Sequence, residues 1–123
     1  RLLYQDYLTM DVEKIKSNYT ENTLFYNVMN SGIDEFKTLD EEFSQFDQYM
    51  EMFELVGLRE SGFPDLLDYD GEGAVVISWI EMTFKNRKSG NTATILQHIQ
   101  HWFNDEGEIV REDYYFNPAQ LPQ

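Results

Sequence analysis

The residues best suited to acid–base chemistry lie in the C-terminal part of the sequence, which holds both histidines, His98 and His101. Side chains alternate along a strand, so these two rings are expected on opposite faces if the segment is extended. One metal ion then does not reach both rings without a bulge. Because the chain also has no cysteine, we expect no metal site, and no cofactor is predicted.

His98 is the first candidate catalytic residue. If the hairpin that follows pairs Phe103 with Glu108, His98 comes close to Asp113. A carboxylate beside an imidazole fixes the tautomer of the ring and favours its protonated form, so this pair would be an acid–base dyad. The alternative interpretation is an ordinary polar contact between strands, since a shift of one residue in register separates the two side chains.

Glu81 is the second candidate acid or base. It shares a strand face with Trp79 among largely apolar neighbours, where burial would disfavour its ionised form. Counting along the hairpin places Glu81 opposite Leu96 or Gln97. In the alternative interpretation Glu81 lies where the strand leaves the core and pairs with Lys85 or meets water.

These candidates belong to a predicted meander of antiparallel strands between Ala74 and Phe116. Three segments are rich in β-branched and aromatic residues, and residues typical of hairpin turns separate them. Neither face of the first two segments is polar enough to lie in water, so both faces are expected to be covered. The three segments read AVVISWIEMTF, TATILQHIQHWF and EIVREDYYF.

The N-terminal part of the sequence is expected to form mainly helices. The clearest of them begins with a capping box between Thr38 and Glu41 and carries an apolar stripe that includes Phe53. Gly57 is suited to end this helix. The other expected elements are a helix over Leu2–Leu8, a helix capped by Asp11, a strand over Thr23–Val28 and a short edge strand over Phe63–Tyr69.

Composition restricts the function classes. A chain of 123 residues is expected to form one domain spanning 1–123. The formal charge of −14 argues against nucleic acid and anionic membranes as partners. No apolar run is long enough to cross a membrane. The sequence begins at Arg1, and both a cytoplasmic protein and an exported one that has lost its signal fit this start.

Helices followed by a run of antiparallel strands indicate an α+β fold. The helices can cover one face of the sheet. We expect a second copy of the chain to cover the other face in a twofold homodimer. The alternative is a sheet curled strongly enough for its own rims to shield that face.

The chain resembles the nuclear-transport-factor-2-like superfamily, in its SnoaL-like polyketide cyclase and ketosteroid isomerase branch. The resemblance rests on Asp11 opening the second helix, the strand Thr23–Val28, the long acidic third helix, and above all the ending from Val75 to Phe116. It implies a cystatin-like α+β cone, in which a curved antiparallel sheet wraps around a long helix. An apolar cavity between helices and sheet, and a dimeric state, are also implied.

The resemblance leaves the activity open. The isomerase branch needs a carboxylate base near the end of the first strand, and this sequence reads Phe25-Tyr26-Asn27 there, which disfavours steroid isomerisation. Three hypotheses follow: an enzyme of the isomerase, cyclase or dehydratase type with His98 or Glu81 as acid or base, a module that binds a partner protein through the sheet, or a binder of a small apolar molecule. The expected ligand contacts are Tyr26, Trp79, His98 and Phe53.

Overall fold

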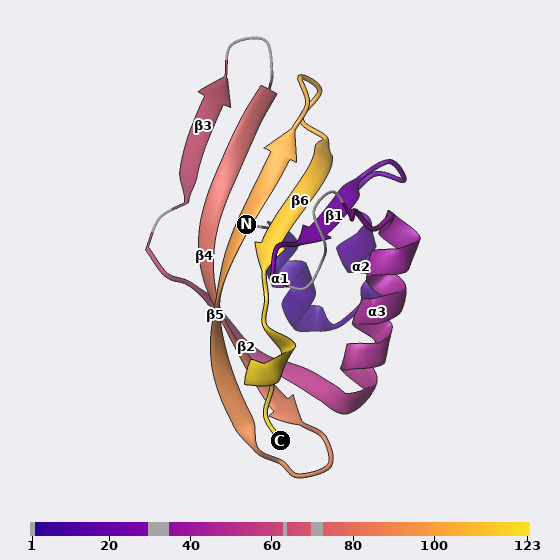
Figure 1. Cartoon of the computed structure of the whole chain (residues 1–123), viewed down its shortest axis with the longest axis vertical. Helices are drawn as coiled ribbons and strands as arrows, with labels where there is room; N and C mark the ends of the chain where they lie inside the picture. Colours follow the sequence, from indigo (N-terminus) through magenta and orange to yellow (C-terminus); the bar gives the residue numbers. More distant parts are fainter. Residues whose placement is uncertain (1, 30–34, 63, 70–72) are drawn as a thin grey trace.

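The computed structural model describes residues 2–29, 35–62, 64–69 and 73–123. Helices gather on one side of a long, bent sheet, with α3 running beside it (Figure 1). The elements in chain order are α1 (Leu2–Thr9), α2 (Val12–Lys16), β1 (Leu24–Asn27), α3 (Leu39–Met52), β2 (Phe53–Glu60), β3 (Asp65–Tyr69), β4 (Gly73–Asn86), β5 (Thr92–Phe103), β6 (Ile109–Tyr115) and a short 3-10 helix, Pro118–Gln120.

The sheet is built around the predicted meander. Its strand order is β1-β6-β5-β4-β2, and β3 pairs with β4 as well. The second half of β4 pairs with β2 and the first half with β3, so these two short strands lie end to end along one edge. The predicted edge strand is thereby confirmed over Asp65–Tyr69, while Phe63 lies outside the described residues. The parallel pairing of β1 with β6 was not foreseen.

The two faces of the sheet differ in what covers them. The inner face, which meets the helices, buries Ile80, Met82 and Ile95 at no more than 7% exposure. The outer face carries the intervening residues, among which Trp79 is 47% and Leu96 is 55% exposed. Within one chain, therefore, only the inner face is fully covered.

Both predicted helix caps are present. The Asp11 side chain accepts a hydrogen bond from the backbone of Lys14 at 3.3 Å. Thr38 Oγ1 accepts from the backbone N–H of Glu41, and Glu41 Oε1 accepts from the backbone N–H of Thr38 at 3.0 Å. The Thr38 hydrogen bonds lower the pKa of Glu41. These reciprocal bonds fix where α3 begins and hence how its inner side meets the sheet.

The prediction for the end of this helix was wrong. Helix α3 ends at Met52, and Phe53–Glu60 forms strand β2. Phe53 continues the apolar stripe of the helix, but Phe53 and Leu55 also alternate with more exposed neighbours, as strand residues do. Phe53–Glu60 pairs with β4, and this pairing favours the strand alternation over the helical repeat. Gly57 then lies at a β-bulge instead of a helix end.

A second core lies beneath the helices at the opposite edge of the sheet. Phe25 on β1 is fully buried, and its ring centroid is 5.0 Å from that of Tyr19 and 6.1 Å from that of Phe43. Ile15 of α2 is also fully buried in this cluster. This packing holds Tyr19 over the inner face of the sheet.

No helix in the described part of the chain is both long and apolar enough to span a membrane.

Candidate functional site

A cavity of about 100 Å³ lies between the inner face of the sheet and α3. Its wall is mainly apolar, because successive inward positions of β4 and β5 carry large hydrophobic side chains. The principal apolar contributors are Phe46, Phe53, Leu55, Met82, Ile99 and Leu121.

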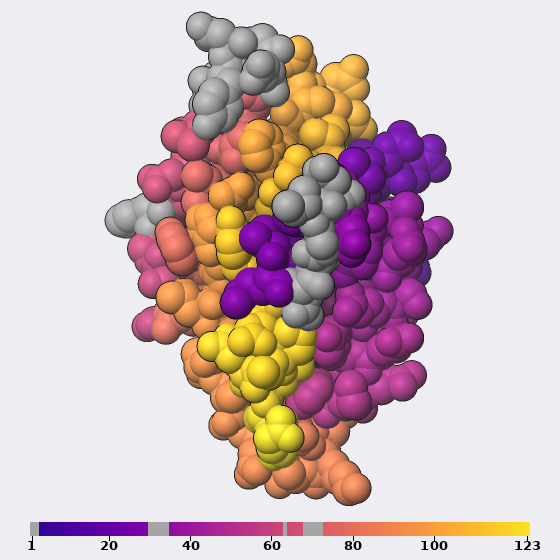
Figure 2. All heavy atoms as spheres, in the orientation of Figure 1, coloured from indigo at the N-terminus to yellow at the C-terminus, as the bar shows by residue number. Residues whose placement is uncertain are grey.

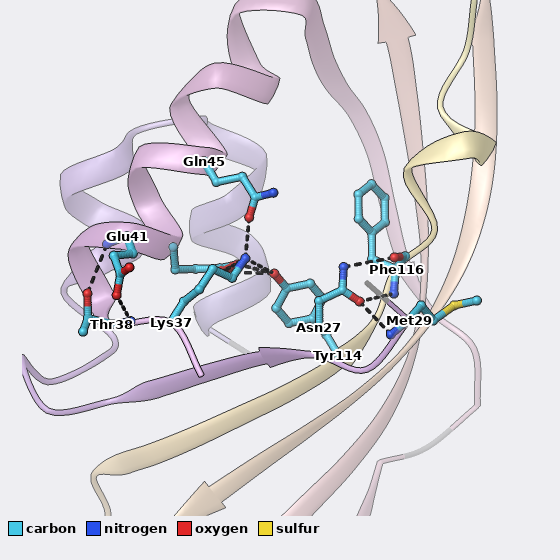
Figure 3. A network of polar contacts seen from close by, with 9 residues as sticks. Asn27, Met29, Lys37, Thr38, Glu41, Gln45, Tyr114 and Phe116 are labelled. Atoms are coloured by element: carbon cyan, nitrogen blue, oxygen red, sulfur yellow. Dashed lines mark hydrogen bonds and ion pairs between the residues drawn. The ribbon is translucent and has the colours of Figure 1, made fainter. Parts of the chain in front are cut away.

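The C-terminal segment closes one side of this cavity. Phe116 and Leu121 both line it. The Asn27 side chain donates to the backbone carbonyl of Phe116 at 3.1 Å and accepts from its backbone N–H at 3.3 Å (Figure 3). The Phe116 ring is 6.0 Å from that of Tyr49, and on the molecular surface the segment lies directly beside α3 (Figure 2). The C-terminal segment and α3 therefore form two walls of the cavity.

A buried polar cluster forms part of the cavity wall. Glu112 on β6 lines the cavity, and its Oε1 accepts a hydrogen bond from the Tyr19 hydroxyl at 2.6 Å. His101 Nε2 lies 2.7 Å from the same oxygen. His101 and Glu112 are direct partners across β5 and β6, so the strand register sets this contact. Two short hydrogen bonds to one oxygen hold the carboxylate in a fixed orientation.

The tyrosines around this carboxylate act as hydrogen-bond donors. Burial, followed by the negative charge of Glu112, raises the pKa of Tyr19 and of Tyr7 well above the ordinary value. Burial also raises the pKa of Tyr4, which lines the cavity. A hydrogen bond between the side chains of Tyr4 and Ser78 opposes this effect of burial on the pKa.

A second polar group ties α3 to the sheet. The Tyr114 hydroxyl donates to Glu42 at 2.6 Å, and Lys37 Nζ forms an ion pair with Glu42 at 2.8 Å. Lys37 also donates to Gln45 and to the Tyr114 hydroxyl (Figure 3). Unlike Glu112, Glu42 has both carboxylate oxygens engaged within the protein.

Glu42 makes the stability of the fold depend on pH. Burial raises the pKa of Glu42, although hydrogen bonds from Lys37 and Tyr114 oppose this effect. The folded chain thus holds the Glu42 proton more tightly than the unfolded chain does, and this stabilisation is lost as pH rises above the ordinary value of 4.5. Urea unfolding between about pH 4 and pH 7 should show wild type losing stability relative to Glu42→Gln as pH rises. A constant difference across this range would contradict the assignment.

Four of the residues proposed from the sequence lie on the outer face of the sheet. Trp79, Glu81, His98 and Asp113 are absent from the cavity lining. Their strand partners show why, since Trp79 pairs with His98 and Glu81 pairs with Leu96 across β4 and β5. The expected position of Glu81 opposite Leu96 and the opposite faces of the two histidines are confirmed. The alternation of residues along the strands did not indicate which face of the sheet the helices would cover.

The expected His98–Asp113 dyad does not form. His98 pairs with Tyr115, because the strand register shifts near Phe103, which pairs with Ile109 rather than Glu108. Asp113 instead accepts two hydrogen bonds from Arg111, at 2.7 and 2.9 Å.

The outer-face partners of His98 and Glu81 are structural. The His98 ring packs at a tilt against two aromatic rings, with its centroid 4.2 Å from that of Trp79 and 5.3 Å from that of Tyr115. Glu81 pairs with Arg59 rather than Lys85. Any chemical role for His98, Glu81 or Asp113 stays a prediction.

The remaining two expected ligand contacts differ in position. Phe53 lines the cavity as expected, although from β2 and not from a helix. Tyr26 pairs with Asp113 and packs against Phe36 at 5.3 Å, outside the cavity lining.

Sequence reasoning missed the inward cluster of Tyr19, His101 and Glu112. The available signal was the alternation of β6, which places Glu112 on the face opposite Asp113. In the described part of the chain, no group of three or more His, Asp or Glu side chains is arranged to hold a metal ion.

Comparison with known proteins finds likeness in structure but not in sequence. No family model matches the sequence, and no protein of curated function does. A ketosteroid isomerase-like protein from Erwinia carotovora atroseptica is 13% identical with a TM-score of 0.73, covering 95% of this chain and 90% of that one.

Two further structures show the same arrangement. A candidate SnoaL-like polyketide cyclase from Mesorhizobium loti is 14% identical with a TM-score of 0.63, covering 93% of this chain and 92% of that one. RV0760c from Mycobacterium tuberculosis, solved in complex with estradiol-17β-hemisuccinate, is 10% identical with a TM-score of 0.67, covering 99% and 96%. At these identities the likeness establishes the fold and leaves the activity open.

Proposed function

We propose that this chain, which has the nuclear-transport-factor-2-like fold, binds a small, mainly apolar molecule inside its cone. The observation that carries the proposal is the cavity between α3 and the sheet, which the surrounding side chains leave unfilled. Protein interiors are normally close-packed, so an unfilled apolar hollow with a few convergent polar groups is the usual form of a ligand site.

The size of the cavity restricts the ligand. Its volume of about 100 Å³ is somewhat below the roughly 150 Å³ of an engineered apolar cavity that holds benzene. A single ring fits after small side-chain rotations, whereas a four-ring steroid requires the cone to open. We therefore expect a ligand of about one ring, which separates this chain from the solved relative in complex with an estradiol derivative.

Thermal unfolding with and without toluene tests the binding proposal. Toluene should raise the unfolding midpoint, because a ligand that binds only the folded state stabilises it. Ile99→Phe fills the cavity from its wall and should remove this shift. Leu96→Phe makes the same kind of change on the outer face of the same strand and should retain it. Equal shifts in the two variants would contradict binding in the cavity.

A second candidate function is proton transfer on a bound carbonyl compound. It is favoured by the Glu112 carboxylate, which lines the cavity and is oriented by two short hydrogen bonds. A carboxylate so placed can accept a proton from the α-carbon of the bound carbonyl compound. In this candidate function the base is Glu112 on the inner face, in place of His98 or Glu81.

Exchange of the α-protons of cyclohexanone in D2O, followed by NMR, tests this second function. The protein should accelerate exchange, Glu112→Gln should abolish the acceleration, and His98→Ala should not change it. Acceleration that persists in Glu112→Gln would contradict the assigned base.

The proposed partner of the outer face is a second copy of the chain. This face exposes Trp79 and Leu96 side by side with the ring of His98, and exposed apolar patches on a sheet mark interaction surfaces. Sedimentation velocity should show a dimer for wild type and a monomer for Leu96→Glu. A wild-type monomer at every concentration would contradict this proposal and leave a different protein partner as the alternative.

A further inference from the structure

The polar groups of the cavity differ in whether the protein already satisfies them. Glu42 is engaged by Tyr114 and Lys37, as described above. On Glu112, both hydrogen bonds reach Oε1, and Oε2 accepts none from the described residues. Glu112 Oε2 is therefore a charged acceptor that the protein leaves free in the cavity wall.

The charges around the cavity disfavour an anionic ligand. Two carboxylates, Glu42 and Glu112, line it, and the Lys37 ammonium that approaches it is paired with Glu42. The negative charge of Glu112 also contributes to the raised pKa values of Tyr4 and Glu42, after burial, so its field reaches across the hollow. A further negative charge placed here would be desolvated beside a like charge, which is costly.

A hydrogen-bond donor on the ligand is favoured instead. An O–H or N–H group can bond to Glu112 Oε2, and hydrogen bonds to a charged acceptor are stronger than neutral ones. The rest of the ligand would then lie against the apolar wall formed by residues such as Met82 and Ile99.

We propose that the cavity selects a single-ring molecule that carries a hydrogen-bond donor, an alcohol or a primary ammonium group, directed at Glu112, and that it rejects the corresponding carboxylate. This inference rests on the proposed binding function and adds the chemical class of the ligand. It follows from the position of one unengaged carboxylate oxygen in a mainly apolar hollow.

Isothermal titration with four probes of nearly equal shape tests the selectivity. Benzylamine and benzyl alcohol supply a cationic and a neutral donor, toluene supplies none, and benzoate supplies a negative charge. Both donors should bind more tightly than toluene, and benzoate should bind least. The ratio of the dissociation constants of benzylamine and benzyl alcohol shows whether an ammonium or a hydroxyl group is the better donor.

Two matched variants locate the interaction. Glu112→Gln keeps the shape of the side chain and removes its charge, and it should weaken benzylamine binding about tenfold to a hundredfold, as expected for one hydrogen bond to a charged group. Toluene binding should stay within about twofold. Asp113→Asn makes the same change in net charge on the adjacent residue of the outer face, and benzylamine should bind to it as to wild type.

The results separate this inference from the function on which it rests. Toluene or benzoate binding as tightly as benzylamine, or unchanged benzylamine binding in Glu112→Gln, would overturn the selectivity while leaving the cavity as a binding site. If none of the four probes bound, the proposed function itself would fall, and the selectivity with it. Equal losses in Glu112→Gln and Asp113→Asn would assign the effect to net charge and overturn the role of Glu112.

Discussion

Replacing His101 by leucine should lower the free energy of unfolding by about 3 kcal/mol, because it removes a partner from a buried carboxylate. His101 is 4% and Glu112 is 6% exposed, so water does not readily take the place of the lost imidazole N–H. Tyr19 would remain as the hydrogen-bond donor of the cluster. Urea unfolding of the purified variant gives this difference directly.

A double-mutant cycle assigns the cause of that loss. Combining His101→Leu with Glu112→Leu removes the charge as well as its partner, and the double variant should recover a large part of the lost stability. His98→Leu is the matched control on the outer face, where Nδ1 of the ring has no hydrogen-bond partner within the described ranges, and it should cost less than about 1 kcal/mol. Strictly additive losses in the cycle would contradict the contact.

Phe25→Ala should cost about 4 kcal/mol, near the middle of the range for deleting a buried aromatic side chain. The ring is fully buried. It packs edge-on against Tyr19, which follows α2, and against Phe43 of α3, so it joins both segments to the sheet. Its loss leaves a cavity and frees Tyr19 to move, so the hydrogen bond to Glu112 should weaken too. Thermal and urea unfolding measure the first effect.

Leu24 provides the control for this variant. It precedes Phe25 on β1 and is 41% exposed, so Leu24→Ala should change stability by less than about 1 kcal/mol. If both variants lost the same amount, strand β1 would not present Phe25 to the core as described.

Much of the fold could be predicted from the sequence because local patterns and tertiary packing agree there. The meander follows from β-branched segments between turn residues, and the caps at Asp11 and Thr38 follow from side chains that satisfy the first backbone N–H groups of a helix. The α+β resemblance to the nuclear-transport-factor-2-like superfamily is confirmed at the level of the fold. Strand β2 was missed because Phe53 fits both a helical stripe and a strand alternation.

The site was harder to predict because its residues are distinguished only by which side of the sheet they face. Alternation correctly separated His98 from His101, but both faces of β4 and β5 carry large apolar side chains, so the pattern did not show which one the helices cover. Phe103 pairs with Ile109 rather than Glu108, and a register shift between Trp102 and Phe103 adds one more residue, so His98 lies opposite Tyr115 instead of Asp113. The side chains that meet Glu112 come from residues far apart in sequence, such as Tyr19.

The central claim is that the hollow between α3 and the inner face of the sheet receives the ligand, and methionine methyl NMR tests it most directly. Of the five methionines, Met50 and Met82 line the cavity, while the methyl groups of the other three serve as internal controls: Met10, Met29 and Met52. Titration with benzyl alcohol should shift the signals of Met50 and Met82 together and saturably. Unchanged Met50 and Met82 signals, or shifts confined to the three controls, would contradict the account.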